Sequence, residues 1–276
     1  MLKQRTLTAL VLAPLAIAAI LLLPTWGFAI LIGAMSLQAL WEWTRLAGIT
    51  HQGVRIGILV LNALLLWLLW TQRAEPFAWV VIGAGVAWWV LALAWLRNLS
   101  FAAAPTRENA ALKLAAGELA VLPAWLALVH LHGDAPSGHA WSLLAVMLVW
   151  AADTGAYFVG KRYGTTKLAP RVSPNKTRAG VWGALLVGGI VALLGSAWLG
   201  ARGGMLAAFL VLAFVTVLAS ILGDLVESLL KRQANVKDSG ALFPGHGGLL
   251  DRVDSVFSAI PVFVAGKALL GLLFAA

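Results

Sequence analysis

Residues 243–255, FPGHGGLLDRVDS, place three glycines, a histidine, an arginine and two aspartates between two long apolar segments. Asp251 and Asp254 flank Arg252 at the i, i+3 spacing that lets two carboxylates bind one hard divalent cation through oxygen. The glycines permit positive φ and close approach of backbone N–H groups to a phosphate. The stretch therefore offers what phosphoryl or nucleotidyl transfer requires. Asp254 could equally cap the helix that follows it.

A second group of polar residues lies just before this stretch. Asp224, Glu227, Ser228 and Lys231 recur at i, i+3, i+4 and i+7, so they share one face of a helix. An ionisable group inside an apolar segment is costly, and a functional role is its default interpretation. The alternative is an intrahelical salt bridge combined with helix capping.

A third group lies in residues 161–180, KRYGTTKLAPRVSPNKTRAG. Its SPNKT segment combines Ser173, Lys176 and Thr177 at an expected turn, where two hydroxyls and an ammonium could grip a phosphate. Asp153, in the apolar segment before it, could face the same cavity. The alternative for the basic residues is ordinary charge at the membrane surface.

Composition places these groups in a membrane protein. Of the 276 residues 61% are hydrophobic and 11% are charged, whereas soluble domains carry about 25% charged residues. Uncharged windows of about 20 residues recur along the chain, and each could cross a hydrocarbon core of about 30 Å. A period-2 pattern typical of a porin-type barrel is absent. We expect an all-α polytopic fold with about nine transmembrane helices, at residues 7–24, 26–47, 55–72, 77–97, 112–131, 140–160, 180–200, 204–230 and 254–275.

The basic residues predict the orientation. With nine spans, 17 of the 20 Lys and Arg fall on the side of the N-terminus, and only Arg73, Arg202 and Lys267 fall on the other. By the positive-inside rule the N-terminal side is cytoplasmic. The net charge of +9 therefore follows from topology, and we expect no nucleic-acid partner.

The same spans predict two regions. Residues 1–131 would supply about five N-terminal membrane helices. Residues 132–276 would form the catalytic membrane region, with about four spans and the cytoplasmic loops 161–180 and 231–254. We expect the active site in these loops and the adjoining helix ends.

Other polar residues carry less information. Glu42 and Glu118 lie in expected spans, where pairing with an arginine such as Arg45 is one role, and their roles stay open. An outer group could bind a metal, but a solvated loop is the favoured interpretation: His130, His132, Asp134 and His139.

Residues 228–254, SLLKRQANVKDSGALFPGHGGLLDRVD, resemble the signature of the phosphatidate cytidylyltransferases, or CDP-diacylglycerol synthases. The resemblance extends to GDLVES at 223–228 and to the segment from Asp153 to Thr177. The signature positions in register are Ser228, Lys231, Arg232, Lys237, Asp238, Gly240, Pro244, His246, Gly247, Gly248, Asp251, Arg252 and Asp254.

This resemblance implies an enzyme that makes CDP-diacylglycerol and pyrophosphate from CTP and phosphatidate. Asp224 and Asp251 would hold the catalytic Mg²⁺, with K⁺ as a further expected cation, and Asp254 and Lys237 would complete the catalytic set. The expected substrate contacts are Lys231, Arg232, Lys237, His246, Gly247, Gly248, Arg252, Ser173, Lys176, Thr177 and Asp153.

Two alternatives stay open on the sequence. A CTP-dependent lipid kinase of the polyprenol type would attack the γ-phosphorus and release CDP. An anion transporter could use the same lysines and buried acids, but it is expected to show broken helices in paired positions, and no such pairing is visible. We expect a bacterial cytoplasmic (inner) membrane protein with CTP, phosphatidate and the bilayer as partners, and we allow for a homodimer.

Overall fold

The computed structural model describes residues 2–242 and 247–274, and within them it has nine helices and two short strands. Seven of these helices are long and apolar enough to cross a membrane. The predicted multi-pass α-helical fold is therefore confirmed. In chain order the elements are α1 (Leu2–Leu22), α2 (Thr25–Leu46), α3 (Gln52–Thr71), α4 (Pro76–Arg97), α5 (Arg107–His132), α6 (Gly138–Tyr163), β1 (Lys167–Ala169), β2 (Ser173–Thr177), α7 (Arg178–Trp198), α8 (Gly203–Gln233) and α9 (Leu250–Phe274).

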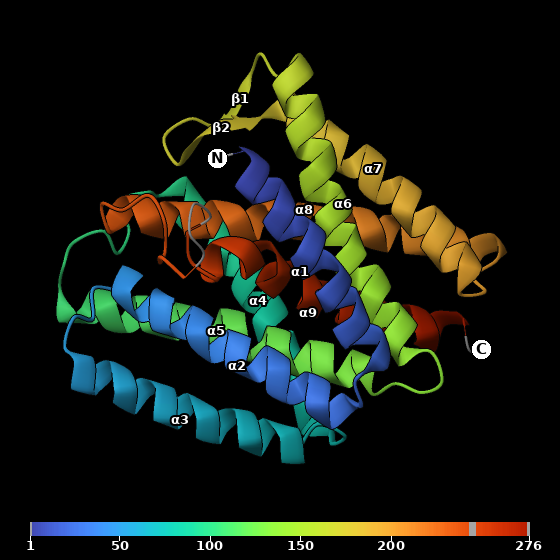
Figure 1. The fold of residues 1–276 in the computed structure, drawn as a ribbon, viewed down its shortest axis with the longest axis horizontal. Coiled ribbons are helices and arrows are strands. Elements are labelled where there is room, and N and C mark those ends of the chain that lie inside the picture. Colours follow the sequence, from blue (N-terminus) through green and yellow to red (C-terminus); the bar gives the residue numbers. More distant parts are fainter. Residues whose placement is uncertain (1, 243–246, 275–276) are drawn as a thin grey trace.

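Helix α5 lies at the centre of the helix assembly. Two thirds of its most apolar window (67%) is buried inside the protein, against 17% for α3, which lies at the edge of the molecule (Figure 1). α5 packs against α2, α4, α6 and α9. The helices expected in residues 1–131 and in residues 132–276 are thus joined through α5.

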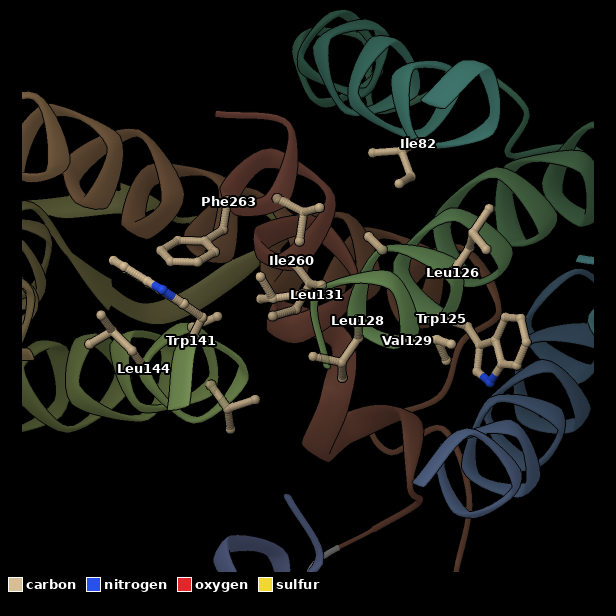
Figure 2. Close-up of a cluster of buried hydrophobic side chains, with 14 of the residues drawn as sticks. Ile82, Trp125, Leu126, Leu128, Val129, Leu131, Trp141, Leu144, Ile260 and Phe263 are labelled. Atoms are coloured by element: carbon tan, nitrogen blue, oxygen red, sulfur yellow. The ribbon is translucent and has the colours of Figure 1, made fainter. Parts of the chain in front are cut away.

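The core around α5 contains side chains from residues 1–131 and from residues 132–276. Figure 2 shows Trp125 and Leu128 of α5 in one cluster with Trp141 of α6 and with Ile260 and Phe263 of α9. A second cluster joins α2, α4, α5, α8 and α9, and it includes Trp43, Leu222 and Leu250. This second cluster includes Val172 and Leu250, which belong to the polar segments that the sequence singled out.

Local sequence signals explain where several helices begin and end. The hydroxyls of Thr106 and Thr177 accept hydrogen bonds from N–H groups in the first turns of α5 and α7. Helix α8 ends before Asn235, whose φ of 54° is in the left-handed region that often terminates helices. Its 31 residues extend about 46 Å at 1.5 Å per residue. This length exceeds a hydrocarbon core of about 30 Å, so α8 is long enough to extend past it.

The two polar segments are shorter than predicted, because the helices extend into them. In the predicted loop 161–180 the helices leave only residues 164–177, and SPNKT forms strand β2 of an antiparallel hairpin instead of a turn. In the predicted loop 231–254 the helices leave residues 234–249. Figure 1 shows the hairpin beyond the end of α6, at the edge of the molecule.

Helices α6 and α7 cross at two glycines that leave no room for a side chain. A Cβ on Gly183 would meet the carbonyl oxygen of Gly155 and would lie 2.5 Å from Cβ of Val159. Small residues let membrane helices approach closely, and in lipid this packing is a main source of helix association. The close α6–α7 contact thus depends on these two positions.

We expect Gly183→Ala to destabilise the protein by about 1–3 kcal/mol, since the added methyl overpacks the helix contact. Gly57→Ala is the matched control, because a Cβ at Gly57 on α3 meets nothing within 4 Å. Its stability should stay equal or rise slightly, as alanine favours helix more than glycine does. Thermal unfolding in detergent measures both, and equal melting temperatures for the two variants would contradict the contact.

Candidate active site

Three carboxylates from two helices meet near the C-terminal part of α8. Asp224 and Glu227 of α8 and Asp254 of α9 each place one oxygen within 4.8 Å of the others. Glu227 and Asp254 are buried, with 1% and 8% of their surface exposed, and Asp224 is partly exposed. We call these three residues the carboxylate cluster.

A close approach of α8 and α9 brings the cluster together. A Cβ at Gly223 would meet the Ser258 hydroxyl and would lie 2.6 Å from the Asp254 carbonyl oxygen. With glycine at this position the two helices touch, so the side chain of Asp254 comes next to those of Asp224 and Glu227. The i, i+3 spacing of the two α8 acids then points both toward α9.

The hairpin supplies the first lysine. Lys176 of β2 forms an ion pair with Asp224, and both side chains keep some exposure to solvent, 23% and 31%. Nε of Arg232 donates a hydrogen bond of 3.3 Å to the Val172 carbonyl, which fixes the hairpin to α8 a second time. The hairpin thus lies over the exposed edge of the carboxylate cluster.

The second lysine lies deeper and bridges two helices. Lys231 of α8 forms an ion pair with Glu227, one turn away on the same helix. The same Nζ lies 2.6 Å from Oδ1 of Asp251 in the first turn of α9. Lys231 therefore joins the carboxylate cluster to the first turn of α9.

Asp251 holds the segment that precedes α9. Its Oδ2 accepts hydrogen bonds from the backbone N–H of Ser239 at 2.9 Å and of Gly248 at 2.8 Å, and the Ser239 hydroxyl lies at 3.0 Å. Gly247 has a φ of 82°, and a Cβ there would lie 2.5 Å from Oδ2 of Asp251. The backbone can wrap around this carboxylate only because glycine occupies that position.

The local charge fits a bound cation. Asp153 of α6 interacts electrostatically with Asp224 and Lys176, so it belongs to the same environment. Five carboxylates, of which Asp153 is exposed, thus share this environment with three cations, Lys176, Lys231 and Arg252. An excess of buried negative charge is costly unless it is paired or coordinates a metal. Glu227 pairs with Lys231 and lies beside Asp251, and among the described residues no further hydrogen-bond donor reaches its buried oxygens. Carboxylate oxygens are the ligands that Mg²⁺ prefers, and the donor set fits that ion.

Comparison with known proteins identifies the family. The chain matches the cytidylyltransferase family over residues 3–269. It belongs to that family. A phosphatidate cytidylyltransferase of Pseudomonas aeruginosa is 42% identical over 269 residues, which cover 96% of each chain. One of Haemophilus influenzae is 36% identical over 282 residues, covering 95% of this chain and 97% of the relative. One of Bacillus subtilis is 42% identical over 124 residues, about half of each chain. The resemblance seen in the signature is confirmed.

In this member of the family the predicted substrate contacts are distributed unevenly. Asp153, Lys176 and Lys231 lie at the carboxylate cluster. Lys237 and Arg252 are exposed to solvent. Other predicted contacts have structural partners: Ser173 pairs with Ala169 in the hairpin, Thr177 caps α7, Arg232 binds the Val172 carbonyl, and Gly247 and Gly248 enclose Asp251. His246 lies outside the described residues.

The predicted metal pair, Asp224 with Asp251, stays a prediction, but the three acids with mutually close oxygens include Glu227 and Asp254 instead. The capping alternative for Asp254 is wrong, because α9 begins at Leu250 and Asp254 lies in its second turn. The intrahelical alternative holds for Glu227 and Lys231, whereas Asp224 pairs with the hairpin.

Sequence reasoning missed the role of Glu42. Among the described residues it has no ion pair with Arg45, and its carboxylate binds the segment that leads into α9. Its position, as a charged residue inside an otherwise apolar span, was the only signal in the sequence. Glu118 accepts a hydrogen bond from Asn62.

The outer histidines do not lie in a solvated loop. Two of them bind backbone carbonyls of α1: buried His132 binds Ile20, and His139 binds Leu21. His130 binds the carbonyl of Arg73.

We expect Lys231→Met to lower the stability of the folded protein by about 3–5 kcal/mol. The substitution leaves Glu227 and Asp251 buried without their cation, and removing one partner of a buried ion pair has this order of cost. Arg97→Met is the control, since Arg97 is an exposed cation at the end of α4. Thermal unfolding in detergent without substrate measures both. Equal melting temperatures for the two variants would show that Lys231 does not hold the site together.

Proposed function

We propose that this protein transfers CMP from CTP to phosphatidate, giving CDP-diacylglycerol and pyrophosphate. The observation that carries the proposal is the carboxylate cluster with its two lysines, in a membrane protein of the cytidylyltransferase family. Two relatives named phosphatidate cytidylyltransferase align with almost the whole chain. A site between lipid and water suits a reaction that joins a water-soluble nucleotide to a lipid head group.

In this proposal Asp224, Glu227 and Asp254 would hold Mg²⁺, and Asp251 would either join them or keep Lys231 in place. The predicted K⁺ would belong to the same acidic environment. When bound, the divalent ion neutralises charge on the phosphates of CTP and makes the α-phosphorus a better electrophile. The fit rests on the donor set, since three hard oxygen donors lie within 4.8 Å of one another.

The remaining chemistry is positioning. An oxygen of the phosphatidate phosphate attacks the α-phosphorus of CTP, a new P–O bond forms, and the bond to pyrophosphate breaks. A phosphate monoester has a second pKa of about 6, so the attacking oxygen is already ionised at pH 7 and needs no general base. Lys176 and exposed Lys237 would offset the charge of the two anions. Their alignment supplies most of the rate enhancement.

Access to CTP requires a particular orientation of the chain in the membrane. Nine spans with a cytoplasmic N-terminus would place the hairpin and residues 234–249 on the side where CTP is available. The bacterial cytoplasmic membrane, with this chain as a monomer or a homodimer, is the expected location. The basic residues near both segments support this orientation through the positive-inside rule.

The product assay tests the reaction. Purified protein with labelled CTP, phosphatidate and Mg²⁺ should form lipid-linked CMP and release pyrophosphate in equal amounts. Asp224→Asn and Asp254→Asn should each lower kcat at least 100-fold, because each removes one charge from the carboxylate cluster. The double variant should be no slower than the slower single variant, since groups that act as one unit are not additive.

Asp134→Asn is the matched control, because Asp134 is an exposed acid that pairs with Lys267. Its kcat should stay within twofold of the unchanged protein. Release of CDP without pyrophosphate would identify a kinase and contradict the proposal. Losses in the two cluster variants that multiply independently would contradict a shared ion.

Single cysteines test the orientation, because the chain has no cysteine of its own. A cysteine at Leu242, whose side chain is 51% exposed, should react with a membrane-impermeant maleimide only in inverted vesicles. A cysteine at exposed Ala74, in the connection between α3 and α4, should react only in right-side-out vesicles. Labelling of both from one face would break the nine-span count.

A further inference from the structure

Glu42 of α2 is a buried carboxylate that binds a segment about 200 residues further along the chain. It is 4% exposed. Its Oε1 accepts hydrogen bonds from Nε2 of Gln38 at 3.0 Å and from the N–H of Leu249 at 2.9 Å. Its Oε2 accepts from the Ser239 hydroxyl at 2.7 Å and from the N–H of Leu250 at 2.9 Å. Four donors thus satisfy one buried charge.

Two glycines let the backbone approach this carboxylate closely. A Cβ at Gly240 would lie 2.7 Å from Oε1 of Glu42, and a Cβ at Gly248 would collide with Oε2. Residues 239–242 and 247–250, which we call the segment, therefore both touch Glu42 directly. The carboxylate also lies at the N-terminus of α9, where a negative charge is favourable and the first N–H groups need acceptors.

Hydrogen bonds connect Glu42 to the carboxylate cluster. The Ser239 hydroxyl shares its single proton between Glu42 and Asp251, with oxygen–oxygen distances of 2.7 and 3.0 Å. Asp251 binds Lys231 at 2.6 Å, and Lys231 pairs with Glu227. A displacement of the segment at Glu42 would thus shift the ammonium group of Lys231, which faces the carboxylate cluster.

Glu42 is itself held firmly. Its neighbour Trp43 is 2% exposed and donates a hydrogen bond of 2.8 Å from Nε1 to the Lys113 carbonyl of α5. A Cβ at Gly117 would lie 2.7 Å from Nε1 of Trp43, so the indole lies in a notch that only glycine leaves open. This contact fixes α2 against the central helix and gives the Glu42 carboxylate a fixed position.

We propose that Glu42 is a positioning residue for the transfer reaction, which holds residues 239–242 and 247–250 so that Asp251 and Lys231 keep the carboxylate cluster in its reactive arrangement. The inference rests on the proposed function. It assigns the N-terminal helices a part in the reaction that goes beyond crossing the membrane. In this role Glu42 acts through the hydrogen bonds of Ser239, Leu249 and Leu250 rather than through contact with a substrate.

Glu42→Gln tests the proposal. Each carboxylate oxygen accepts from one backbone N–H, so an amide places an NH₂ group against Leu249 or Leu250 whichever way it is turned. We expect kcat to fall at least tenfold. Hydrogen–deuterium exchange of the Leu249 and Leu250 amides should accelerate at least tenfold, while exchange in the middle of α5 stays unchanged. A general loss of stability would accelerate exchange in both places.

Glu118→Gln is the matched control, because it removes a half-buried acid of the N-terminal helices that binds Asn62 rather than the segment. Its kcat and its exchange at Leu249 and Leu250 should stay within twofold. Ser239→Ala keeps both N–H bonds to Glu42 and removes the bridging hydroxyl, so it tests the same connection if Glu42→Gln does not fold. It should lower kcat at least threefold with an unchanged melting temperature.

Unchanged kcat in Glu42→Gln, or unchanged exchange at Leu249 and Leu250, would overturn the proposal. So would losses in Glu42→Gln and Ser239→Ala that simply multiply in the double variant, since two residues in one connection should couple. If the unaltered protein made no lipid-linked CMP, the proposed function would fail. The exchange rates would then still decide whether Glu42 holds the segment.

Discussion

The structure around the C-terminal part of α8 must accommodate an excess of buried negative charge. Asp224, Glu227 and Asp254 have oxygens within 4.8 Å of one another, and a low dielectric makes their mutual repulsion strong. Lys176 and Lys231 offset part of it. A divalent cation bound between these acids would offset more of it. The surrounding elements supply or position the compensating charges.

The two lysines come from different elements, and further elements hold them in place. The hairpin brings Lys176 to Asp224, and α8 itself presents Lys231 between Glu227 and Asp251. The first turn of α9 keeps Asp251 in place, and α2 holds the preceding segment by the Glu42 carboxylate. The helices nearest the N-terminus therefore contribute to the geometry of a site whose acids lie in the last third of the chain.

The sequence predicted the parts of this site that depend on local spacing. The periodicity of residues 224–231 placed the acids on one face of a helix, and apolar length located the helices. Three features were out of reach, because they depend on contacts between distant segments: the pair Lys176–Asp224, the bridge from Lys231 to Asp251, and the binding of residues 239–242 and 247–250 by Glu42. The start of α9 was placed four residues too late, because its first turn is polar and apolar patterning cannot detect it.

The position of the bound cation is the most direct test of this account. Crystals grown with Mn²⁺ in place of Mg²⁺ and with CTP would reveal the ion by its anomalous scattering. We expect one peak about 2 Å from an oxygen of each of Asp224, Glu227 and Asp254, as hard divalent ions bind carboxylates at this distance. A peak on Asp251 with Lys231 displaced, and none at the three clustered acids, would contradict the account.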